Sequence, residues 1–512
     1  MHWKPIADPI EEKQFAKHLR RSSKFYVFLW SIREELFDKK FQEELIAAYS
    51  PRGQEPCPPA LLAMVMLLQR FDGVSDADAV DEAENDRRWQ LVLGTLGQDR
   101  APFGQGTLVR FRVKAIEHDL DKKLVDRTVQ IAKKTKLFSW KHLKVALDSS
   151  PLEGAGRVED TWNLIGRAMS KVVGAVAKAS GVDASVVIEG AGLTVLDGPS
   201  IKAALDVDWG DPDERQAALE RLVTEADQLE GWVIEHMKDE ATKPPLSESL
   251  DLLRRVVSQD LEPDPNGGGR RIRDGVAKDR VISVGDTEMR HGRKSRSTTI
   301  KGYKRHIVIA NRFILGTTIA PANRPEHEQM PRLLALAREK GKIASVHFDR
   351  GYLASPQVEA LRAQGVALHS RPWGRKRNGL FGKEQFLISM KAGVVACPAG
   401  EVTNITAKGA AVFPEAMCGT CALKPSCTRS KRKSLQLHRN EDLLVELRGA
   451  QATAEGRAEY RNRTAVEHRL ARVDAIQGAK ARYKGVRKNE LDLNRSAALV
   501  NLQEIARLRR VA

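Results

Sequence analysis

Apolar residues recur every three or four positions through the first quarter of the chain, which is the spacing of an amphipathic helix. One such run begins at Pro58 and Pro59, and proline is favoured in the first turn of a helix. Ser75 precedes an acidic segment and is a suitable N-cap. A basic amphipathic helix is expected over residues 106–134. We therefore predict an N-terminal helical domain over residues 1–138.

The role of this domain stays open at the level of sequence. Arg110, Arg112 and Lys114 lie in the expected basic helix and could bind DNA. The domain could equally be a packing or dimerisation unit.

A two-residue alternation replaces the helical pattern after Lys141. Leu143, Val145 and Leu147 would share one buried face of a strand, with Asp148 at its exit. A second short buried strand ends at Asp349.

Further strands and a helix are expected around that second strand. Residues 280–286 have a strand pattern, residues 306–320 predict a hairpin about an Asn-Arg turn, and residues 324–341 predict a helix. Another strand is expected from residue 365. This order of elements predicts a mixed α/β sheet with helices on its faces.

A long helical segment would interrupt this sheet. We expect it to be an insertion over residues 165–279, and the Pro- and Gly-rich residues 262–271 predict a linker. The sheet domain would then consist of residues 139–164, 280–384 and 435–512.

A late helix is expected to carry three polar side chains on one stripe. Tyr460, Arg463 and Glu467 stand at i, i+3 and i+7. A second stripe is apolar and would pack on a core: Val466, Leu470 and Val473. A carboxylate held this way can ligate a hard metal ion, and the Arg and Tyr can hold a phosphate beside it. The alternative is an ordinary charged surface helix.

Asp148, Asp349 and Glu467 are the candidate catalytic residues. Active sites of open α/β sheets lie at strand ends, and a packed helix could bring Glu467 to them. Three neighbouring carboxylates repel one another, so the site should recruit two Mg²⁺ or Mn²⁺ ions. Such a pair of ions assists phosphodiester displacement. For any single aspartate, a role as a cap or turn residue is the simpler interpretation.

Four cysteines form a second constellation with the spacing C-x20-C-x2-C-x5-C. These are Cys397, Cys418, Cys421 and Cys427. Four thiolates with one short knuckle suit a tetrahedral, structural Zn²⁺ site, and we expect a zinc knuckle over residues 385–434. Unpaired thiols in a loop are the alternative.

The chain carries 84 Lys and Arg against 67 Asp and Glu, a net charge of +17. This excess suggests a polyanionic partner, with nucleic acid as the leading candidate, and a generally basic, solvated surface is the alternative. The absence of long apolar runs and of a signal-peptide core, together with the clustered cysteines, predicts a cytoplasmic, nucleoid-associated protein without a membrane partner. The candidate DNA-binding cations in basic stretches are Arg293, Lys294, Lys301, Arg305 and Lys480.

Three motifs, LDSSPLEGAG, VHFDRGY and YRNRTAVEHR, together resemble those of DDE insertion-sequence transposases. The third is similar to the Y-x2-R-x3-E-x6-K helix of one large group, with Tyr460, Arg463 and Glu467 in place. The Lys position holds Asp474, so Arg472 or Lys480 would have to supply that cation.

Other segments resemble the insertion-sequence family numbered eleven eighty-two, and the similarity covers most of the chain. They are SDADAVDEAENDRRW, GAGRVEDTWNLI, SVGDTEMRHGRKSRSTTIKGYKRHIV and RYKGVRKNELDLNRSAALVNLQEIARL. In that family the place of Asp286 and Glu288 is structural and DNA-facing, so they are not counted as catalytic. Glu326, His327 and Glu328 are interpreted as a loop that enters a helix.

The resemblance implies an RNase H-like core in which Asp148, Asp349 and Glu467 bind two divalent ions. Water would cut a phosphodiester at the transposon end, and the released 3′-OH would attack target DNA. Tyr460 and Arg463 would contact phosphates, and Trp162 would line the active site and stabilise a flipped base or hairpin end. The partners would be double-stranded terminal inverted repeats and target DNA, bound by a homodimer or a higher assembly.

Two rival functions remain at this level. A nuclease of the same fold would use the same carboxylates to cut DNA without joining it. A transposase-derived DNA-binding protein would have lost catalysis altogether.

Overall fold

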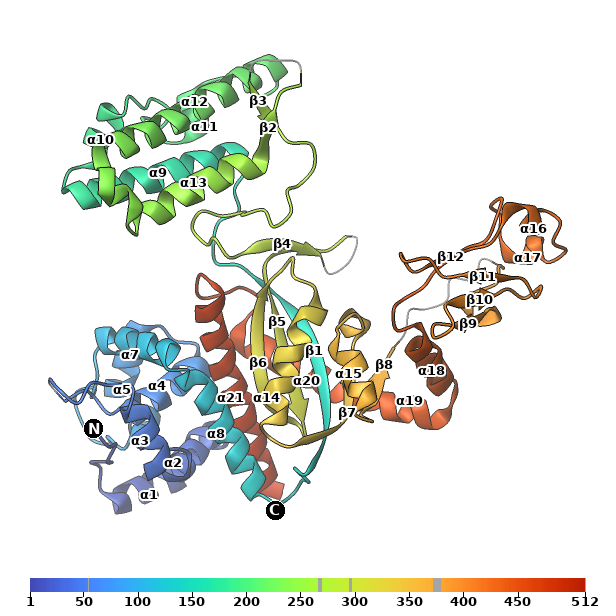
Figure 1. Ribbon diagram of the computed structural model, residues 1–512. Coiled ribbons are helices and arrows are strands. Elements are labelled where there is room, and N and C mark those ends of the chain that lie inside the picture. Colours follow the sequence, from blue (N-terminus) through green and yellow to red (C-terminus); the bar gives the residue numbers. More distant parts are fainter. Residues whose placement is uncertain (54, 266–268, 294–296, 372–378, 512) are drawn as a thin grey trace.

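A six-stranded mixed sheet organises the molecule (Figure 1). The computed structural model describes residues 1–511 except residues 54, 266–268, 294–296 and 372–378. The sheet strands are β1 (His142–Glu153), β4 (Arg290–Arg293), β5 (Thr299–Ala310), β6 (Phe313–Pro321), β7 (Lys342–Phe348) and β8 (Ala367–Ser370). β1 lies between antiparallel β5 and parallel β7, β8 pairs in parallel with β7, and both β4 and β6 pair with β5. The expected mixed α/β sheet is confirmed.

The central strand β1 is longer than the sequence predicted. Val145 and Leu147 are fully buried as expected, but the strand continues through Pro151. Asp148 therefore lies inside β1 rather than at its exit, two residues beyond Ala146, the last residue that pairs with β7. Beyond Ala146, β1 pairs with β5 but no longer with β7. Pro151 lies in this part of the strand, and a strand tolerates a proline where one side of its backbone is not paired.

β5 and β6 form the predicted hairpin. Asn311 and Arg312 connect them with φ angles of 51° and 72°. A tight two-residue hairpin turn of type I′ needs positive φ at both positions, and Asn adopts this conformation readily. The pattern of this segment was therefore sufficient to place the turn and β6, but β5 begins at Thr299, seven residues before the predicted hairpin.

Helices cover both faces of the sheet. On β6, the Thr317 hydroxyl donates to Asn494 of α21 (Val486–Val511) over 2.7 Å. The next residue, Thr318, faces the opposite layer and accepts a hydrogen bond from α14 (Met330–Arg338). All of β6 except its last residue is buried, because each face has its own helix.

Residues 280–286 do not form the predicted strand. The Val281 amide donates to the side-chain oxygen of Gln259 over 2.9 Å, and the Val284 amide donates to the Glu159 carboxylate over 2.9 Å. Both valines are buried, which explains the strand-like pattern. Their amides bond to side chains instead of a neighbouring strand.

The N-terminal segment is helical, as predicted. Its helices are α1 (Pro9–His18), η1 (Arg21–Ser23), α2 (Lys24–Leu36), α3 (Lys39–Ile46), α4 (Pro59–Asp72), α5 (Asp76–Asn85), α6 (Arg87–Leu93), α7 (Gln105–Glu117) and α8 (Leu120–Lys134). Pro58 precedes α4, and Ser75 forms a capping box at α5. The single helix expected over residues 106–134 is two helices, because Asp119 adopts a left-handed conformation with a φ of 53°.

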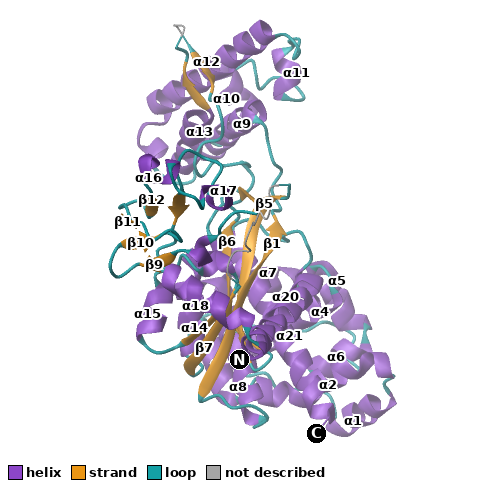
Figure 2. Cartoon of the chain, turned by 90° about the vertical axis from the view of Figure 1, so that its right-hand side faces the viewer, coloured by secondary structure: helices purple, strands orange, loops and turns teal. Residues whose placement is uncertain are grey.

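The N-terminal helices share one continuous hydrophobic core with the sheet. Helix α21 lies between them and contacts α4, α8 and β6. Figures 1 and 2 both show α21 running beside the strands, with the N-terminal helices on its outer side. The predicted domain over residues 1–138 is thus packed against the sheet.

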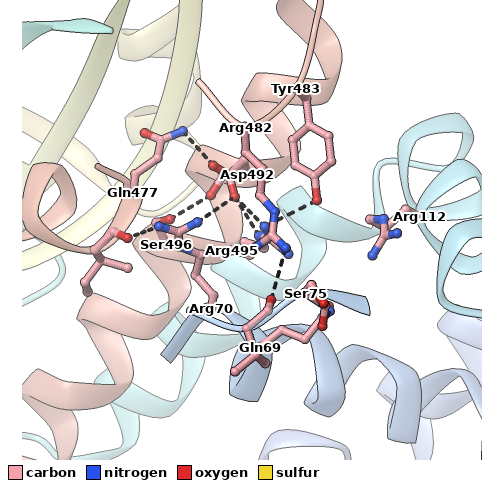
Figure 3. Close-up of polar contacts among 12 residues, drawn as sticks. Gln69, Arg70, Ser75, Arg112, Gln477, Arg482, Tyr483, Asp492, Arg495 and Ser496 are labelled. Atoms are coloured by element: carbon pink, nitrogen blue, oxygen red, sulfur yellow. Dashed lines mark hydrogen bonds and ion pairs between the residues drawn. The ribbon is translucent and has the colours of Figure 1, made fainter. Parts of the chain in front are cut away.

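A buried polar network adds to this packing (Figure 3). The Asp492 carboxylate of α21 is fully buried and accepts from Arg495 over 2.7 Å and from Gln477 over 3.2 Å. Arg70 of α4 pairs with the same carboxylate over 3.5 Å. Arg112, a candidate DNA contact, instead pairs with Asp76, whose other partner is Gln69 of α4.

The helical insertion has a separate core and lies beyond β4 at one end of the sheet (Figure 1). Its elements are α9 (Thr161–Ser180), α10 (Ala184–Gly190), α11 (Ile201–Leu205), α12 (Pro212–Met237), η2 (Lys238–Thr242), α13 (Leu246–Asp260), β2 (Leu261–Pro263) and β3 (Arg270–Ile272). The expected linker over residues 262–271 lies mainly in the β2–β3 hairpin, whose residues 266–268 are outside the described residues.

The cysteine segment forms a small unit next to α18 (Figure 1). Its elements are η5 (Lys383–Gln385), β9 (Leu387–Ser389), β10 (Val394–Ala396), β11 (Val402–Asn404), β12 (Ala410–Val412), α16 (Glu415–Gly419), α17 (Lys424–Cys427) and β13 (Ser434–Gln436). Phe386, Val395 and Phe413 are buried in its own core. The remaining elements are η3 (Glu326–Gln329), η4 (Arg350–Tyr352), α15 (Gln357–Ala363), α18 (Glu441–Ala452), α19 (Ala454–Tyr460), η6 (Arg461–Arg463) and α20 (Thr464–Gln477).

Candidate active site

The sheet register brings Asp148 and Asp349 onto neighbouring strands. Ala146 of β1 pairs with His347 of β7, and each aspartate follows its paired residue by two positions. Both side chains therefore extend from the same face of the sheet, because side chains two residues apart point the same way. Asp349 directly follows β7 and caps η4 by accepting from the Arg350 amide over 2.8 Å.

Arg463 links Glu467 to Asp148. The Arg463 guanidinium lies 3.3 Å from the Asp148 carboxylate and 3.2 Å from the Glu467 carboxylate. It also donates to the Tyr460 hydroxyl over 3.0 Å. The structure thus gathers both aspartates, Glu467, Arg463 and Tyr460 at one place.

The segment that carries these side chains is not the single helix predicted from Tyr460 to Arg472. α19 ends at Tyr460, η6 forms one tight turn, and α20 begins at Thr464. The apolar stripe is confirmed, since Val466 and Val473 are fully buried and Leu470 is 5% exposed. The local pattern fixed the buried face of α20, but it could not reveal the turn in which Arg463 meets Asp148 of a distant strand.

Electrostatics at this site disfavour a full set of ionised carboxylates. Burial raises the pKa of Asp148 to about 6 from an ordinary value of 3.8, and Arg463 opposes this shift. Asp349 and Glu467 raise the pKa of Asp148 further through repulsion between like charges. The pKa of Arg463 is raised, although burial alone would lower it, because Asp148, Tyr460 and Asp349 favour its charged form.

The donor set suits hard divalent cations. The three side chains offer carboxylate oxygens, which are the ligands that Mg²⁺ and Mn²⁺ prefer. The oxygens do not all lie within 4.8 Å of one another, and Arg463 supplies the positive charge between Asp148 and Glu467. Asp349 and Glu467 repel the charge of Asp148, and added cations would relieve this repulsion.

Glu326 adjoins the site and was missed from the sequence. Its carboxylate accepts from the Ser149 hydroxyl over 2.6 Å, next to Asp148. Its other oxygen lies where a Cβ on Gly351 would be, two residues beyond Asp349. The segment from Glu326 is indeed a turn that leads into α14, as expected, but that turn follows β6 to the active-site edge of the sheet. No local motif marks this long-range contact.

Arg305 and Asp474 form a buried link rather than a DNA contact. Arg305 is 2% exposed and donates to Ser150 over 3.1 Å and to the carbonyl of Pro151 over 2.7 Å. It also pairs with Asp474 over 3.1 Å. The prediction that Arg305 binds DNA is therefore not supported, and the acidic residue at the Lys position has a structural partner.

The other predicted cations differ in accessibility. Arg293, Lys301 and Lys480 are exposed, whereas Lys294 lies outside the described residues. Lys301 and Lys480 flank Glu153 at the end of β1: the Lys301 amide donates to its carboxylate, and Lys480 forms a β-bridge with it. Arg472 donates to Gln503 of α21 over 3.2 Å.

Trp162 belongs to the packing of the insertion. It is the second residue of α9, and its ring meets Trp209 edge-on at 5.3 Å. The Lys202 ammonium lies 5.8 Å from the Trp162 ring centre. The Trp162 indole N–H is buried and has no hydrogen-bond partner within the described chain.

The four cysteines of the predicted knuckle line one pocket of about 260 Å³. Burial raises the pKa of Cys427, and Lys433 partly opposes this shift. Repulsion from the other three thiols also raises it, so all four are near one another. No three of their sulfur atoms lie within 4.8 Å of one another. Cys57 is distant in the chain and its pKa is raised to about 11 by burial.

Within the described residues, no helix is long and apolar enough to span a membrane. This agrees with the sequence, in which no apolar run of that length occurs.

Comparison with protein families gives two matches. A family described as "Transposase DDE domain" matches residues 396–506, which include Glu467 and the cysteines. A family described as "Transposase domain (DUF772)" matches residues 13–114. No curated protein and no solved structure matches the chain. The matches do not distinguish among insertion-sequence families, so the similarity to the family numbered eleven eighty-two stays a prediction. With a DDE domain at its C-terminal part and a second transposase domain near its start, the chain belongs to the DDE transposases of insertion sequences.

Proposed function

We propose that this transposase cuts the DNA strand at a transposon end and joins the released 3′-OH to target DNA, with Asp148, Asp349 and Glu467 as catalytic residues. The observation that carries this proposal is that Arg463 pairs with both Asp148 and Glu467, while Asp349 ends the strand that runs parallel to β1. The charge of Asp349 also shifts the pKa values of Asp148 and Arg463, so the three acids belong to one electrostatic site.

The sheet is proposed to be an RNase H-like core. Three antiparallel neighbours, β6, β5 and β1, are followed by parallel β7 and β8. The first aspartate lies on the central strand, the second follows the adjacent parallel strand, and the glutamate lies on a helix that packs against β1. This strand order and the places of the three acids support the assignment of the core. Three carboxylates placed in this way suit two-metal phosphodiester chemistry.

The carboxylates are proposed to hold two Mg²⁺ or Mn²⁺ ions, which supply charge stabilisation for attacking and leaving oxygens when bound. Asp148 must be ionised to act as a ligand. Because its pKa is raised, its carboxyl gives up the proton less readily than an ordinary aspartate does. Arg463 and Tyr460 would turn from the carboxylates toward a phosphate, because a guanidinium binds phosphate oxygens as readily as carboxylate oxygens.

The four cysteines are proposed to hold a structural Zn²⁺ ion. Their shared pocket and their mutual electrostatic effect support this, and a thiolate set suits zinc. The sulfurs would have to move closer together on binding, which is expected of a small unit with few buried apolar residues.

Double-stranded DNA is the proposed substrate, in the form of terminal inverted repeats and target DNA. Arg293, Lys301 and Lys480 are exposed and provide salt-dependent phosphate contacts. Because two ends have to be cut together, we propose that the protein acts as a homodimer or a higher assembly on DNA.

The test is strand cleavage and joining on end-sequence DNA with Mg²⁺ or Mn²⁺. Glu467→Gln keeps the side-chain shape but removes the charge, so the variant should bind DNA and lose both steps. Glu455→Gln on α19 is the matched control, since Glu455 is exposed and should leave both steps unchanged. An active Glu467→Gln would reject the catalytic assignment.

The same assay separates the two rival functions. Cleavage without joining by the wild type would favour a nuclease, and DNA binding without cleavage would favour a catalytically inactive descendant of a transposase.

A further inference from the structure

Two histidines and a glutamate gather on the sheet face that carries the aspartates. His347 of β7, His369 of β8 and Glu459 of α19 offer ligand atoms that all lie within 4.8 Å of one another. Within the part of the chain that the structure describes, this is the one group of three potential metal ligands so close together. It is distinct from the carboxylates and from the cysteines.

The backbone fixes the two imidazoles beside each other. His347 and His369 are register partners on parallel strands, and their rings stack with centroids 4.5 Å apart. The His347 Nε2 atom lies 3.5 Å from the Glu459 carboxylate. With metal–ligand bonds of 2.0–2.1 Å, ligand atoms of a tetrahedral zinc site are about 3.3 Å apart. Small side-chain adjustments would therefore complete the geometry.

His347 lacks the hydrogen bonds that a buried imidazole normally has. Its side chain is 1% exposed, and its Nδ1 atom has no hydrogen-bond partner among the residues that the structure describes. Its Nε2 atom has long contacts, 3.4 Å to the Ser345 hydroxyl and 3.5 Å to Glu459. Buried polar groups are nearly always well partnered, so the Nε2 atom, with only these two long contacts, is the atom of the ring that a bound ion would satisfy.

One neighbour competes with a cation at this position. The Lys144 ammonium lies 3.1 Å from the Glu459 carboxylate. The lysine side chain is 62% exposed, and ion pairs of this kind contribute little stability. Lys144 can therefore withdraw into solvent when a divalent ion takes its place.

We propose that His347, His369 and Glu459 bind a divalent transition-metal ion of the zinc class. Two imidazoles and one carboxylate select such an ion over Mg²⁺, which prefers oxygen ligands. The fourth position is left for water or an anionic oxygen. The ion would join β7, β8 and α19. It would thereby fix the end of β7, next to Asp349, relative to the end of α19, where Tyr460 lies.

This inference goes beyond the proposed function and does not depend on it, because metal binding can be measured without DNA. Purified full-length protein is loaded with Zn²⁺, dialysed against excess Mg²⁺ to clear oxygen-ligand sites, and analysed for zinc per chain. Wild type should retain one more zinc than His369→Gln or Glu459→Gln. His142→Gln, an exposed histidine on β1, is the matched control and should retain the wild-type content.

Two further measurements separate this site from the cysteines and from misfolding. When Co²⁺ replaces zinc, the thiolate charge-transfer band of the cysteine site should be the same in wild type and in His369→Gln. The visible absorption from the histidine site should be lower in His369→Gln than in wild type. Lys144→Gln removes the competing ammonium and should tighten binding of the extra ion several-fold, which a variant that merely perturbs folding would not do. Equal zinc content and equal affinity in wild type, His369→Gln and Glu459→Gln would overturn the proposal.

Discussion

Asp148 combines two requirements that conflict in the absence of metal. Its position on β1, paired with β5 and just past the last residue that pairs with β7, buries the carboxyl, while its proposed role as a ligand requires a negative charge. The raised pKa, about 6, records the cost of that charge. The residue types at this site were visible in the sequence, because three acids occurred in motif-like segments. The electrostatic interaction among these acids was not visible in the sequence. It arises from the burial of Asp148 and from the guanidinium of Arg463, which is 315 residues away along the chain.

The first prediction concerns Asp148→Asn in metal-free protein. Because the pKa of Asp148 is higher in the folded state than in the unfolded state, the contribution of this residue to stability is fully present below pH 4 and is lost as the pH rises through about 6. Asn avoids this loss, so the variant should gain about 1–3 kcal/mol over wild type above pH 6. The midpoint of thermal unfolding in chelator, measured from pH 4 to pH 8, tests this. A variant that is equally or less stable at pH 8 would contradict the prediction.

The second prediction concerns Glu326→Gln. Glu326 contacts Ser149 and approaches Gly351, so it fixes the two segments that carry Asp148 and Asp349. Loss of its charge should lower the cleavage rate about 10–100-fold, with a higher metal concentration needed for half-maximal rate. Glu328→Gln, an exposed neighbour, is the control. An unchanged metal dependence would show that Glu326 is not a positioning residue.

Elements with local signals were predictable from sequence. The N-cap at Ser75 and the Asn-Arg turn between β5 and β6 appear as predicted, because short-range geometry determines both. Elements that depend on distant partners were not predictable. Residues 280–286 have strand composition but give their amides to Gln259 and Glu159. The break between α19 and α20 likewise carries Arg463, which contacts a strand far away in the chain.

The third prediction is at this scale and concerns Arg305→Met. The guanidinium joins β1 to the end of α20 through Ser150, Gln477 and Asp474. Replacement removes the cation that pairs with Asp474 and leaves the Gln477 side-chain oxygen and the carbonyls of Pro151 and Gly478 without this donor. These losses should lower the free energy of unfolding by about 3–5 kcal/mol. Arg472→Met, on an exposed part of α20, should have little effect. Chemical denaturation of both variants distinguishes a structural cation from a DNA contact.

At the scale of the molecule, the sequence predicted an insertion, a cysteine unit and a helical N-terminal part. The insertion and the cysteine unit do have their own cores. The N-terminal part does not, because its buried residues continue into the sheet across α21. A core shared between two parts of the chain cannot be predicted from composition. The sequence pattern of an amphipathic helix shows which face is buried but not which element packs against that face.

The fourth prediction concerns the cysteine unit as a whole. Zinc chelation should increase hydrogen exchange over residues 385–434 while the sheet strands stay protected, because the unit has few buried apolar residues of its own. Cys421→Ser should reproduce this effect without chelator, and Cys57→Ser should not. Protection that is unchanged after chelation would argue against a structural zinc ion.

The place of α21 has a consequence for how the protein is made. This helix forms much of the interface between the first 134 residues and the sheet, beside the direct contact of α8 with β6, yet it begins only at Val486. During synthesis, the N-terminal helices and the strands therefore emerge from the ribosome long before the helix that joins them. Their facing apolar surfaces stay exposed in the meantime, so the nascent chain is expected to need chaperone binding until α21 arrives.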